Sequence, residues 1–297
     1  MEKISTVNNY LVFHNGTIEN QICNEDILIN GNNVVVNHAT SLQIIYLIDQ
    51  DGEYQFNLEL NGKLELIEFY DIKAASTLNK KIDVARNAEI LRYSDNQSME
   101  NCKANLLEEI NVARNAHVKV AYVELSNSDI EMNIDYKLQE NDANVALRLA
   151  SLAKKTEKKH LTLSITHLAP YTIGIMDNYG VVKDNASLVI DGIGTIKKGN
   201  HQSNSHQANK IIVFDEKCNA KANPYLYIDE YDVKASHGAS VGKIDENHLY
   251  YLQSRGLSRD ASLHLVTYGY FIPVLEYIEN DELKEKFNQI LKEKVAF

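Results

Sequence analysis

A short motif recurs in this chain at a fixed offset of 28 residues. The stretch KIDVARNAEILRY (81–93) returns as EINVARNAHVKVA (109–121), and both copies contain Val-Ala-Arg-Asn-Ala. A degenerate third copy, ENDANVALRL, spans 140–149, and KDNASLVIDG (183–192) repeats the Asn-Ala pair before apolar residues. A period of roughly 20 to 50 residues is typical of stacked units that cannot bury their apolar faces alone. The repeat therefore predicts a solenoid.

Within each copy, a polar turn is joined to short segments in which apolar residues alternate with polar ones. Two such segments are Val118, Val120, Tyr122 and Val145, Leu147, Leu149. Alternation with period two predicts strands that show one face to a core, and asparagine suits the left-handed backbone of tight corners. We therefore expect a mainly β fold with a parallel β-helix core. An antiparallel sandwich with a chance repeat is the alternative.

From about residue 245 the pattern becomes helical. Asp245 is a suitable N-cap for ENHLYYLQSRG, and Ser258 can cap RDASLHLVTYGYF, where Ala261, Leu265 and Tyr268 are spaced to share one face. Pro273 should then produce a kink or a restart at PVLEYIE, because proline cannot continue a helix without losing a hydrogen bond.

A last amphipathic helix is predicted for ELKEKFNQILKEKVAF, which follows Asp281. Its apolar stripe consists of Leu283, Phe287, Ile290 and Leu291. The chain is thus expected to divide into a β-helix core with a short N-terminal segment (1–244) and a C-terminal helical domain (245–297). We expect the helices to close the open end of the solenoid, where strand edges would otherwise be unpaired; docking of a partner is the alternative.

Composition narrows the partners and the compartment. The 297 residues carry a net charge of −11, which argues against a nucleic acid or an anionic membrane as partner. The start MEKISTVNNYLVF lacks the pattern of a signal peptide, and no apolar run approaches the roughly 18 residues of a membrane span. We therefore expect a cytoplasmic protein. Cys23, Cys102 and Cys218 are widely spaced, which favours small, partly buried side chains over a disulfide or zinc framework.

No common catalytic or nucleotide-binding motif is present. DGIGTIKKGN (191–200) has three glycines but no following helix, and a turn is the expected structure. His201 and His206 lie in a polar segment that favours a solvated loop, and His167 follows an apolar run as a candidate strand histidine. Asp229, Glu230 and Asp232 crowd together without forming a convincing acid and base pair.

His237 stands apart because its neighbours in KASHGASVGKID (234–245) are small and leave the imidazole accessible. A structural turn histidine and a metal ligand are both compatible with the residues alone, since neutral imidazole binds iron and zinc well.

A longer segment around His237 carries a family resemblance. Its motifs are Asn223-Pro224 before YLYI, the run DVKASHGA (232–239), VGK (241–243), Tyr251-Leu252 and SRG (254–256), and upstream THLAPYT (166–172) resembles an H-x-A-x-x-T stretch. Together they resemble the C-terminal signature of the SufB/SufD family, the scaffold subunits of the SUF iron-sulfur cluster assembly machinery. The SHGASVG form is similar to SufD, whereas SufB usually has an acidic version at this point.

The resemblance implies a right-handed parallel β-helix with a C-terminal helical domain. It also implies a scaffold that is not an enzyme, pairs with a SufB-like subunit through the β-helix, and engages a SufC-like ATPase through its helices. His237 would then help to bind a transient iron-sulfur cluster, with a cysteine of the SufB-like partner supplying thiolate and no nucleotide bound by this chain.

Two departures from the family pattern leave alternatives open. Many relatives have a cysteine where this chain has Ala235, so a ligand role there would rest on His237 alone, and the N-terminal helical region typical of SufD is largely missing. A structural homodimer without cluster chemistry is one alternative. A β-helix enzyme acting on carbohydrate is another, although it would require a carboxylate or basic cluster along one face of the solenoid.

Overall fold

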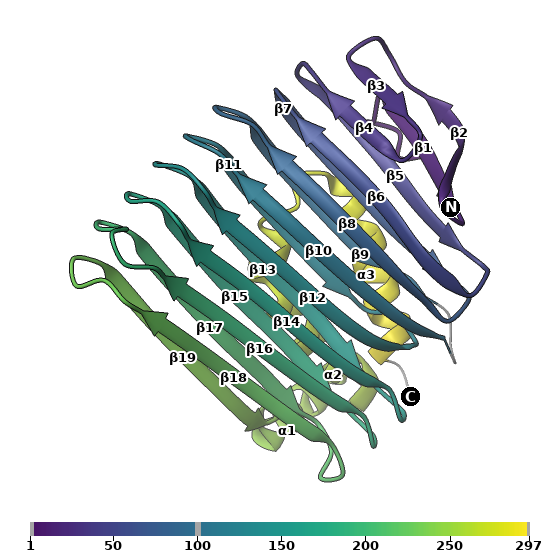
Figure 1. Cartoon of the computed structure of the whole chain (residues 1–297). Helices are drawn as coiled ribbons and strands as arrows, with labels where there is room; N and C mark the ends of the chain where they lie inside the picture. Colours follow the sequence, from purple (N-terminus) through teal and green to yellow (C-terminus); the bar gives the residue numbers. More distant parts are fainter. Residues whose placement is uncertain (1–2, 99–101, 296–297) are drawn as a thin grey trace.

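The computed structural model describes residues 3–98 and 102–295, in which nineteen strands precede three helices (Figure 1). The strands are β1 (Asn9–His14), β2 (Thr17–Ile22), β3 (Ile27–Asn30), β4 (Asn33–Val36), β5 (Thr40–Ile48), β6 (Gly52–Leu60), β7 (Lys63–Ile72), β8 (Ser76–Val84), β9 (Glu89–Asn96), β10 (Lys103–Val112), β11 (His117–Glu124), β12 (Asp129–Leu138), β13 (Asn144–Ala153), β14 (Lys158–His167), β15 (Ile173–Val182), β16 (Ser187–Ile196), β17 (Asn204–Val213), β18 (Asn219–Ile228) and β19 (Lys234–Lys243). The helices are α1 (Glu246–Ser254), α2 (Arg259–Leu275) and α3 (Asp281–Val295).

Successive strands from β4 to β19 alternate between two stacked sheets. One sheet runs in the order β19-β17-β15-β13-β11-β9-β7-β5-β1-β2, and we call it the helix-side sheet; the opposite sheet runs β18-β16-β14-β12-β10-β8-β6-β4-β3. Neighbours within each sheet are parallel and in register from β4 and β5 onward, for example Ile82 beside Ile110. The mainly β prediction with a parallel β-helix core and C-terminal helices is confirmed.

The sequence repeat corresponds to one full turn of the solenoid. Asn87 and Asn115 lie at the corners β8–β9 and β10–β11 with left-handed φ angles of 61° and 53°, and the Asn115 amide donates to Asn87 Oδ1 at 2.9 Å. Asp142, in the third copy, takes the same conformation at the next corner of this edge. The segment KDNASLVIDG (183–192) is not a copy of the same corner. Its left-handed residue, Asp184, lies at the opposite edge of the solenoid, between β15 and β16.

The lumen between the sheets is mostly aliphatic, but its middle turns hold a cluster of buried charges. Glu68, Lys80, Arg92 and Glu108 are all nearly inaccessible to solvent, and the two cations contact both carboxylates. Tyrosine hydroxyls complete the network, as where Tyr122 accepts from Arg92 at 2.8 Å. Two positive and two negative charges balance, which is the condition under which such groups tolerate burial.

The helices cover the outer face of the helix-side sheet and leave the end of the solenoid open (Figure 1). Phe271, Phe287 and Leu291 of α2 and α3 share one apolar cluster with Phe69 and Val123 of the strands. The expected closure of the open end is therefore wrong. The physical reason is that β7, β11, β13 and β15 are buried on both faces in their second halves, where most residues are apolar, so the outer face of this sheet requires a cover. Among the described residues, no helix is long and apolar enough to cross a lipid bilayer.

Details of the helices confirm some predictions and correct others. Asp245 and Ser258 cap α1 and α2 as expected, by accepting from the backbone amides of Asn247 and Ala261. The predicted stripe on α2 is wrong, because Leu265 is 48% exposed and the buried face is formed by other residues. Those buried residues are Ser262, Leu263, Thr267, Phe271, Val274 and Leu275.

Pro273 does not restart α2, since the helix runs through it and ends at Leu275. The predicted stripe of α3 is confirmed for Leu283, Phe287 and Leu291, with Ile290 partly buried beside them. Residues 296–297, the end of the predicted helical segment, lie outside the described residues.

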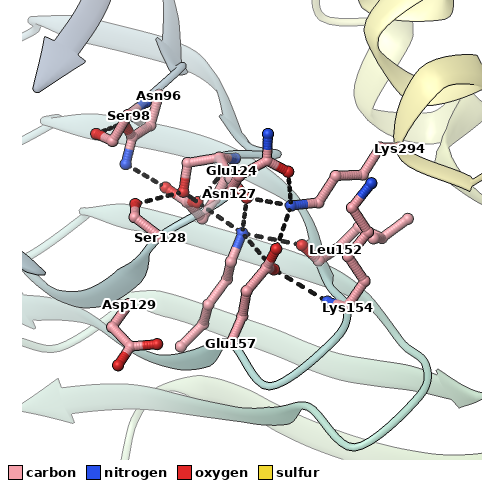
Figure 2. A network of polar contacts seen from close by, with 12 residues as sticks. Asn96, Ser98, Glu124, Asn127, Ser128, Asp129, Leu152, Lys154, Glu157 and Lys294 are labelled. Carbon is pink, nitrogen blue, oxygen red and sulfur yellow. Dashed lines mark hydrogen bonds and ion pairs between the residues drawn. The ribbon is translucent and has the colours of Figure 1, made fainter. Parts of the chain in front are cut away.

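The end of α3 is fixed to one corner of the solenoid by a buried ammonium group. Figure 2 shows Lys294 reaching from the helix toward Asn127 and Glu157, whose oxygens lie 2.9 and 2.8 Å from its Nζ. The carbonyl of Ser126 is a third acceptor, and Lys159 is held beside it by Glu124 at 2.9 Å. Three acceptors satisfy all three hydrogens of the ammonium. These bonds fix the end of α3 to the β11–β12 and β13–β14 corners.

Candidate functional site at the open end of the solenoid

His237 lies in the middle of β19, the last strand of the helix-side sheet. It is a strand residue, so the structural turn interpretation does not apply. Register pairing places it beside Gln207 of β17, and side chains paired in this way share one face of a sheet, here the face toward the lumen. All residues of β19 are exposed, and a Cβ added at Gly238 or Gly242 would meet nothing within 4 Å. The imidazole is therefore open to a ligand or to another chain.

The open end combines free strand edges with exposed apolar side chains. β18 and β19 are the terminal strands of their sheets, so each has one edge without a neighbouring strand among the described residues. Tyr225 and Tyr227 are stacked on the outer face of β18, with ring planes 3° apart. The exposed large apolar side chains of this turn are Tyr225, Tyr227, Ile228, Tyr231 and Val241. An uncovered edge with apolar neighbours is typical of a surface that pairs with another chain.

His201 and His206, which the sequence also singled out, do not face the lumen beside His237. The predicted loop is wrong for residues 204–210, which form β17, and His206 lies on the outer face with Nδ1 2.7 Å from Ser236 Oγ. His201 lies in the preceding turn and contacts the Gly199 carbonyl. The two side chains therefore do not converge on one ligand position.

His167 is fully buried at the end of β14, as a strand histidine. Its Nδ1 lies 2.7 Å from Thr172 Oγ1, and that hydroxyl is 3.0 Å from the carbonyl of Ala169. The H-x-A-x-x-T stretch is thus a local hydrogen-bonding unit. If the hydroxyl donates to the carbonyl, the imidazole donates from Nδ1, and Nε2 is left without a partner. Burial lowers the pKa of His167 to about 4, so the ring is neutral at neutral pH.

The cysteines and the acidic turn supply no metal site. Cys102 is buried and Cys23 and Cys218 are partly buried, as expected, and burial raises the pKa of all three thiols. Glu230 accepts from the Gly199 amide in the exposed turn that precedes β19. Across residues 3–98 and 102–295, no three His, Cys, Asp or Glu side chains gather closely enough to hold a metal ion.

A shallow groove of about 700 Å³ runs across the outer face of the opposite sheet. It contains two neighbouring carboxylates that the sequence did not bring together, Glu109 and Asp135. Lys137 lies 2.6 Å from Glu109 and 3.8 Å from Asp135, and burial raises the pKa of Asp135. The two carboxylates lie side by side on one face of the sheet and share one ammonium, so the arrangement is not that of an opposed acid and base across a glycosidic bond.

A second exposed apolar surface lies on the helices. Its large side chains are Tyr250, Tyr251, Leu257, Leu265 and Ile272. They come from α1, the α1–α2 turn and the side of α2 that faces away from the sheet, whereas the opposite side of α2 packs on β11, β13 and β15. The helices therefore have one face for the solenoid and another that is free to contact a partner.

Comparison with known proteins defines the class, a family of iron-sulfur cluster assembly proteins. The family described as SUF system FeS cluster assembly, SufBD core domain, matches residues 52–270, which is well over half of the chain. The chain therefore belongs to the SufBD core family, as the motifs around His237 predicted.

The relatives of this chain include two SufD proteins and several other SufBD family proteins. SufD of Bacillus subtilis is 37% identical over 139 residues, which is 47% of this chain and 32% of that protein. SufD of Escherichia coli is 26% identical over 150 residues, 50% of this chain and 36% of that protein. A SufBD family protein of Mycobacterium tuberculosis is 33% identical over 108 residues. The matched region thus spans about a third of the length of the two SufD proteins.

Proposed function

We propose that this chain is a SufD-like scaffold subunit that pairs with a SufB-like subunit through the open end of its solenoid. A single observation carries the proposal: the last strand of the solenoid is exposed along its whole length and holds His237 at its centre. Two unpaired strand edges and the aromatic side chains beside them fit association with the sheets of a second solenoid. The acidic chain then acts in the cytoplasm as part of a protein complex.

His237 would bind a nascent iron-sulfur cluster only in combination with the partner. One imidazole nitrogen cannot hold a cluster by itself, and Ala235, two residues earlier on the same face of β19, has no donor atom. Thiolates from the SufB-like chain would supply the remaining ligands. A histidine in place of one cysteine is compatible with iron-sulfur chemistry, as in Rieske centres. In this proposal the cluster is cargo, and the chain binds it without catalysing a reaction.

The helices are proposed to engage a SufC-like ATPase, so that nucleotide is bound by that partner and not by this chain. The apolar residues on the outer side of α1 and α2 support this assignment, because packing on the strands leaves them uncovered. The two units would then have separate roles, with a boundary at about residue 244. Residues 1–244 would pair with the SufB-like subunit, and residues 245–297 would dock the ATPase.

The test is the His237→Ala variant in a complex coexpressed with SufB-like and SufC-like partners. We expect the complex to elute as in wild type, because the imidazole is exposed and no described group bonds to it, while bound iron and acid-labile sulfide fall about tenfold or more. Iron and sulfide per complex are measured after anaerobic reconstitution.

His206→Ala is the matched control, since His206 lies on the neighbouring strand but on its outer face. Wild-type loading of iron and sulfide in His237→Ala would contradict the cluster role. A chain that forms a stable homodimer and captures neither partner would instead favour the structural homodimer.

A further inference from the structure

The last turn of the solenoid lacks the apolar core that holds the earlier turns. No residue of β18 or β19 is buried, and only Ala220 and Ala222 of β18 pack partly against the lumen. Hydrophobic burial grows with the apolar area removed from water, so it contributes little to holding these two strands. Something else must fix the strand that carries His237.

Two buried amides cross the lumen to β18. Gln207 and Asn209 face inward from β17 and are 1% and 0% exposed. Gln207 Nε2 donates to the Tyr225 carbonyl at 2.6 Å, and Asn209 Nδ2 donates to the Asn223 carbonyl at 3.0 Å. Asn178, one turn deeper, donates to Asn209 Oδ1 at 2.8 Å and so extends the amides inward.

The lumen-facing positions of the helix-side sheet change from apolar to polar residues toward the open end. Leu147 and Leu149 of β13 occupy the positions that Gln207 and Asn209 occupy in β17. Leucine would fill the lumen but could not donate to β18. The amides are present although Oε1 of Gln207 and Oδ1 of Asn178 accept no hydrogen bond from any described group. An unpaired buried acceptor destabilises the fold, so their presence points to a role other than filling space.

Gly192 makes room for these amides. A Cβ at this position of β16 would lie 2.6 Å from Gln207 Oε1 and 3.0 Å from Asn209 Nδ2. Glycine within a strand commonly marks a close approach of another group. The segment 191–196, for which the sequence predicted a turn, is in fact a strand whose glycines face the lumen.

We propose that Gln207 and Asn209 are positioning residues for His237. The inference rests on the proposed cluster role of that histidine. Gln207 and Asn209 are the register partners of His237 and Ala239, so the amides lie one strand spacing, about 4.8 Å, below the site. Their hydrogen bonds tether β18 to β17. They therefore fix the strand on which β19 stacks, β17, relative to the strand that precedes β19 in the chain, β18. The imidazole is thereby held where a cluster shared with another chain requires it.

The first experiment measures the tether in the isolated chain by hydrogen exchange. Gln207→Met and Gln207→Leu keep a side chain of similar size, but neither can donate to the Tyr225 carbonyl. We expect amide exchange in residues 219–243 to become about fivefold faster in both variants, and that in β5 to β13 to stay unchanged. Gln139→Met is the control, because Gln139 donates to Asn111 at 2.6 Å on the outer surface. Unchanged exchange in 219–243 would overturn the tether.

The second experiment follows the site itself in the reconstituted complex. Gln207→Met and Gly192→Ala are expected to shift the absorption or paramagnetic resonance spectrum of the cluster and to lower its occupancy severalfold, whereas Gln139→Met gives the wild-type spectrum. A wild-type spectrum at full occupancy would overturn the positioning role. If His237→Ala also loads normally while exchange still rises in Gln207→Met, the proposed function fails and the tether stands.

Discussion

Replacing Arg92 with methionine is expected to lower the free energy of unfolding by about 3–5 kcal/mol. The guanidinium is fully buried in the lumen and donates to both oxygens of Glu108 at 2.7 Å. Burial alone would raise the pKa of Glu108, but the charges of Arg92 and Lys80 hold it below its ordinary value. Methionine leaves one carboxylate without a compensating charge in a site that water cannot reach. Urea unfolding at neutral pH measures the effect.

Charge balance, rather than the size of the side chain, should govern this effect. Arg92→Met combined with Glu108→Gln restores neutrality, because Lys80 and Glu68 remain as a pair. We expect the double variant to be more stable than Arg92→Met alone. Arg86→Met is the control, since Arg86 pairs with Glu140 on the surface and its side chain is 65% exposed. A double variant no more stable than the single one would show that packing, and not the unpaired charge, dominates.

The solenoid could be predicted because its corners repeat a chemical requirement. Asn87 and Asn115 occupy equivalent left-handed positions, and the alanine that follows each of them is buried in the corner. A residue type that tolerates this backbone must recur once per turn, so the period of the sequence reports the geometry of the fold. The turn at Asp184 shows what the repeat cannot predict. Corners on opposite edges of the solenoid have similar sequences, so the similarity does not tell at which edge a corner lies.

The position of the helices was mispredicted because periodicity identifies an apolar face but not the surface that it contacts. A relevant signal was nevertheless present in the strands. Residues 118–123, VKVAYV, are apolar at nearly every position, which is typical of a strand buried on both faces. A solenoid strand that faces solvent would alternate. This run therefore indicated that the helices pack on the outer face of that sheet.

His237 was singled out as a candidate through its motif, whereas the residues one strand below it were not singled out, because they are polar. Gln207 and Asn209 lie in a Ser/Asn/Gln-rich segment that favours a loop by composition, and Gly192 lies in one that favours a turn. Only the fold shows that Gly192 lies opposite the amides of Gln207 and Asn209. Such complementarity between distant residues has no local signature in a single sequence.

The second large effect is an acid dependence with two opposing parts. The pKa of His167 is lowered by burial to about 4, against about 6.5 in the unfolded chain, so the unfolded state takes up this proton first. The contribution of neutral His167 to the free energy of unfolding is fully present above pH 6.5. It is lost as the pH falls toward 4, by about 3 kcal/mol in total. Burial raises the pKa of Asp95 to about 6, although Tyr93 and Gln97 donate to it.

For Asp95 the sign is reversed. The folded state takes up the proton first, so this group adds stability as the pH falls from about 6 to 4, again by about 3 kcal/mol. The two contributions largely cancel in the wild-type chain. Removing either one should expose the other. Between pH 6.5 and 4.5, His167→Asn is expected to lose about 2 kcal/mol less stability than wild type, and Asp95→Asn about 2 kcal/mol more.

The comparison uses the change with pH within each variant, so a lower absolute stability of His167→Asn does not affect it. Urea unfolding at the two pH values gives both numbers, and His160→Asn, on the outer face of the same strand as His167, is the matched control. Opposite deviations in the two variants require both groups to titrate inside the folded protein with the stated signs. Identical acid dependence in wild type and both variants would mean that water reaches these sites before unfolding, and that the lumen near His167 opens at acid pH.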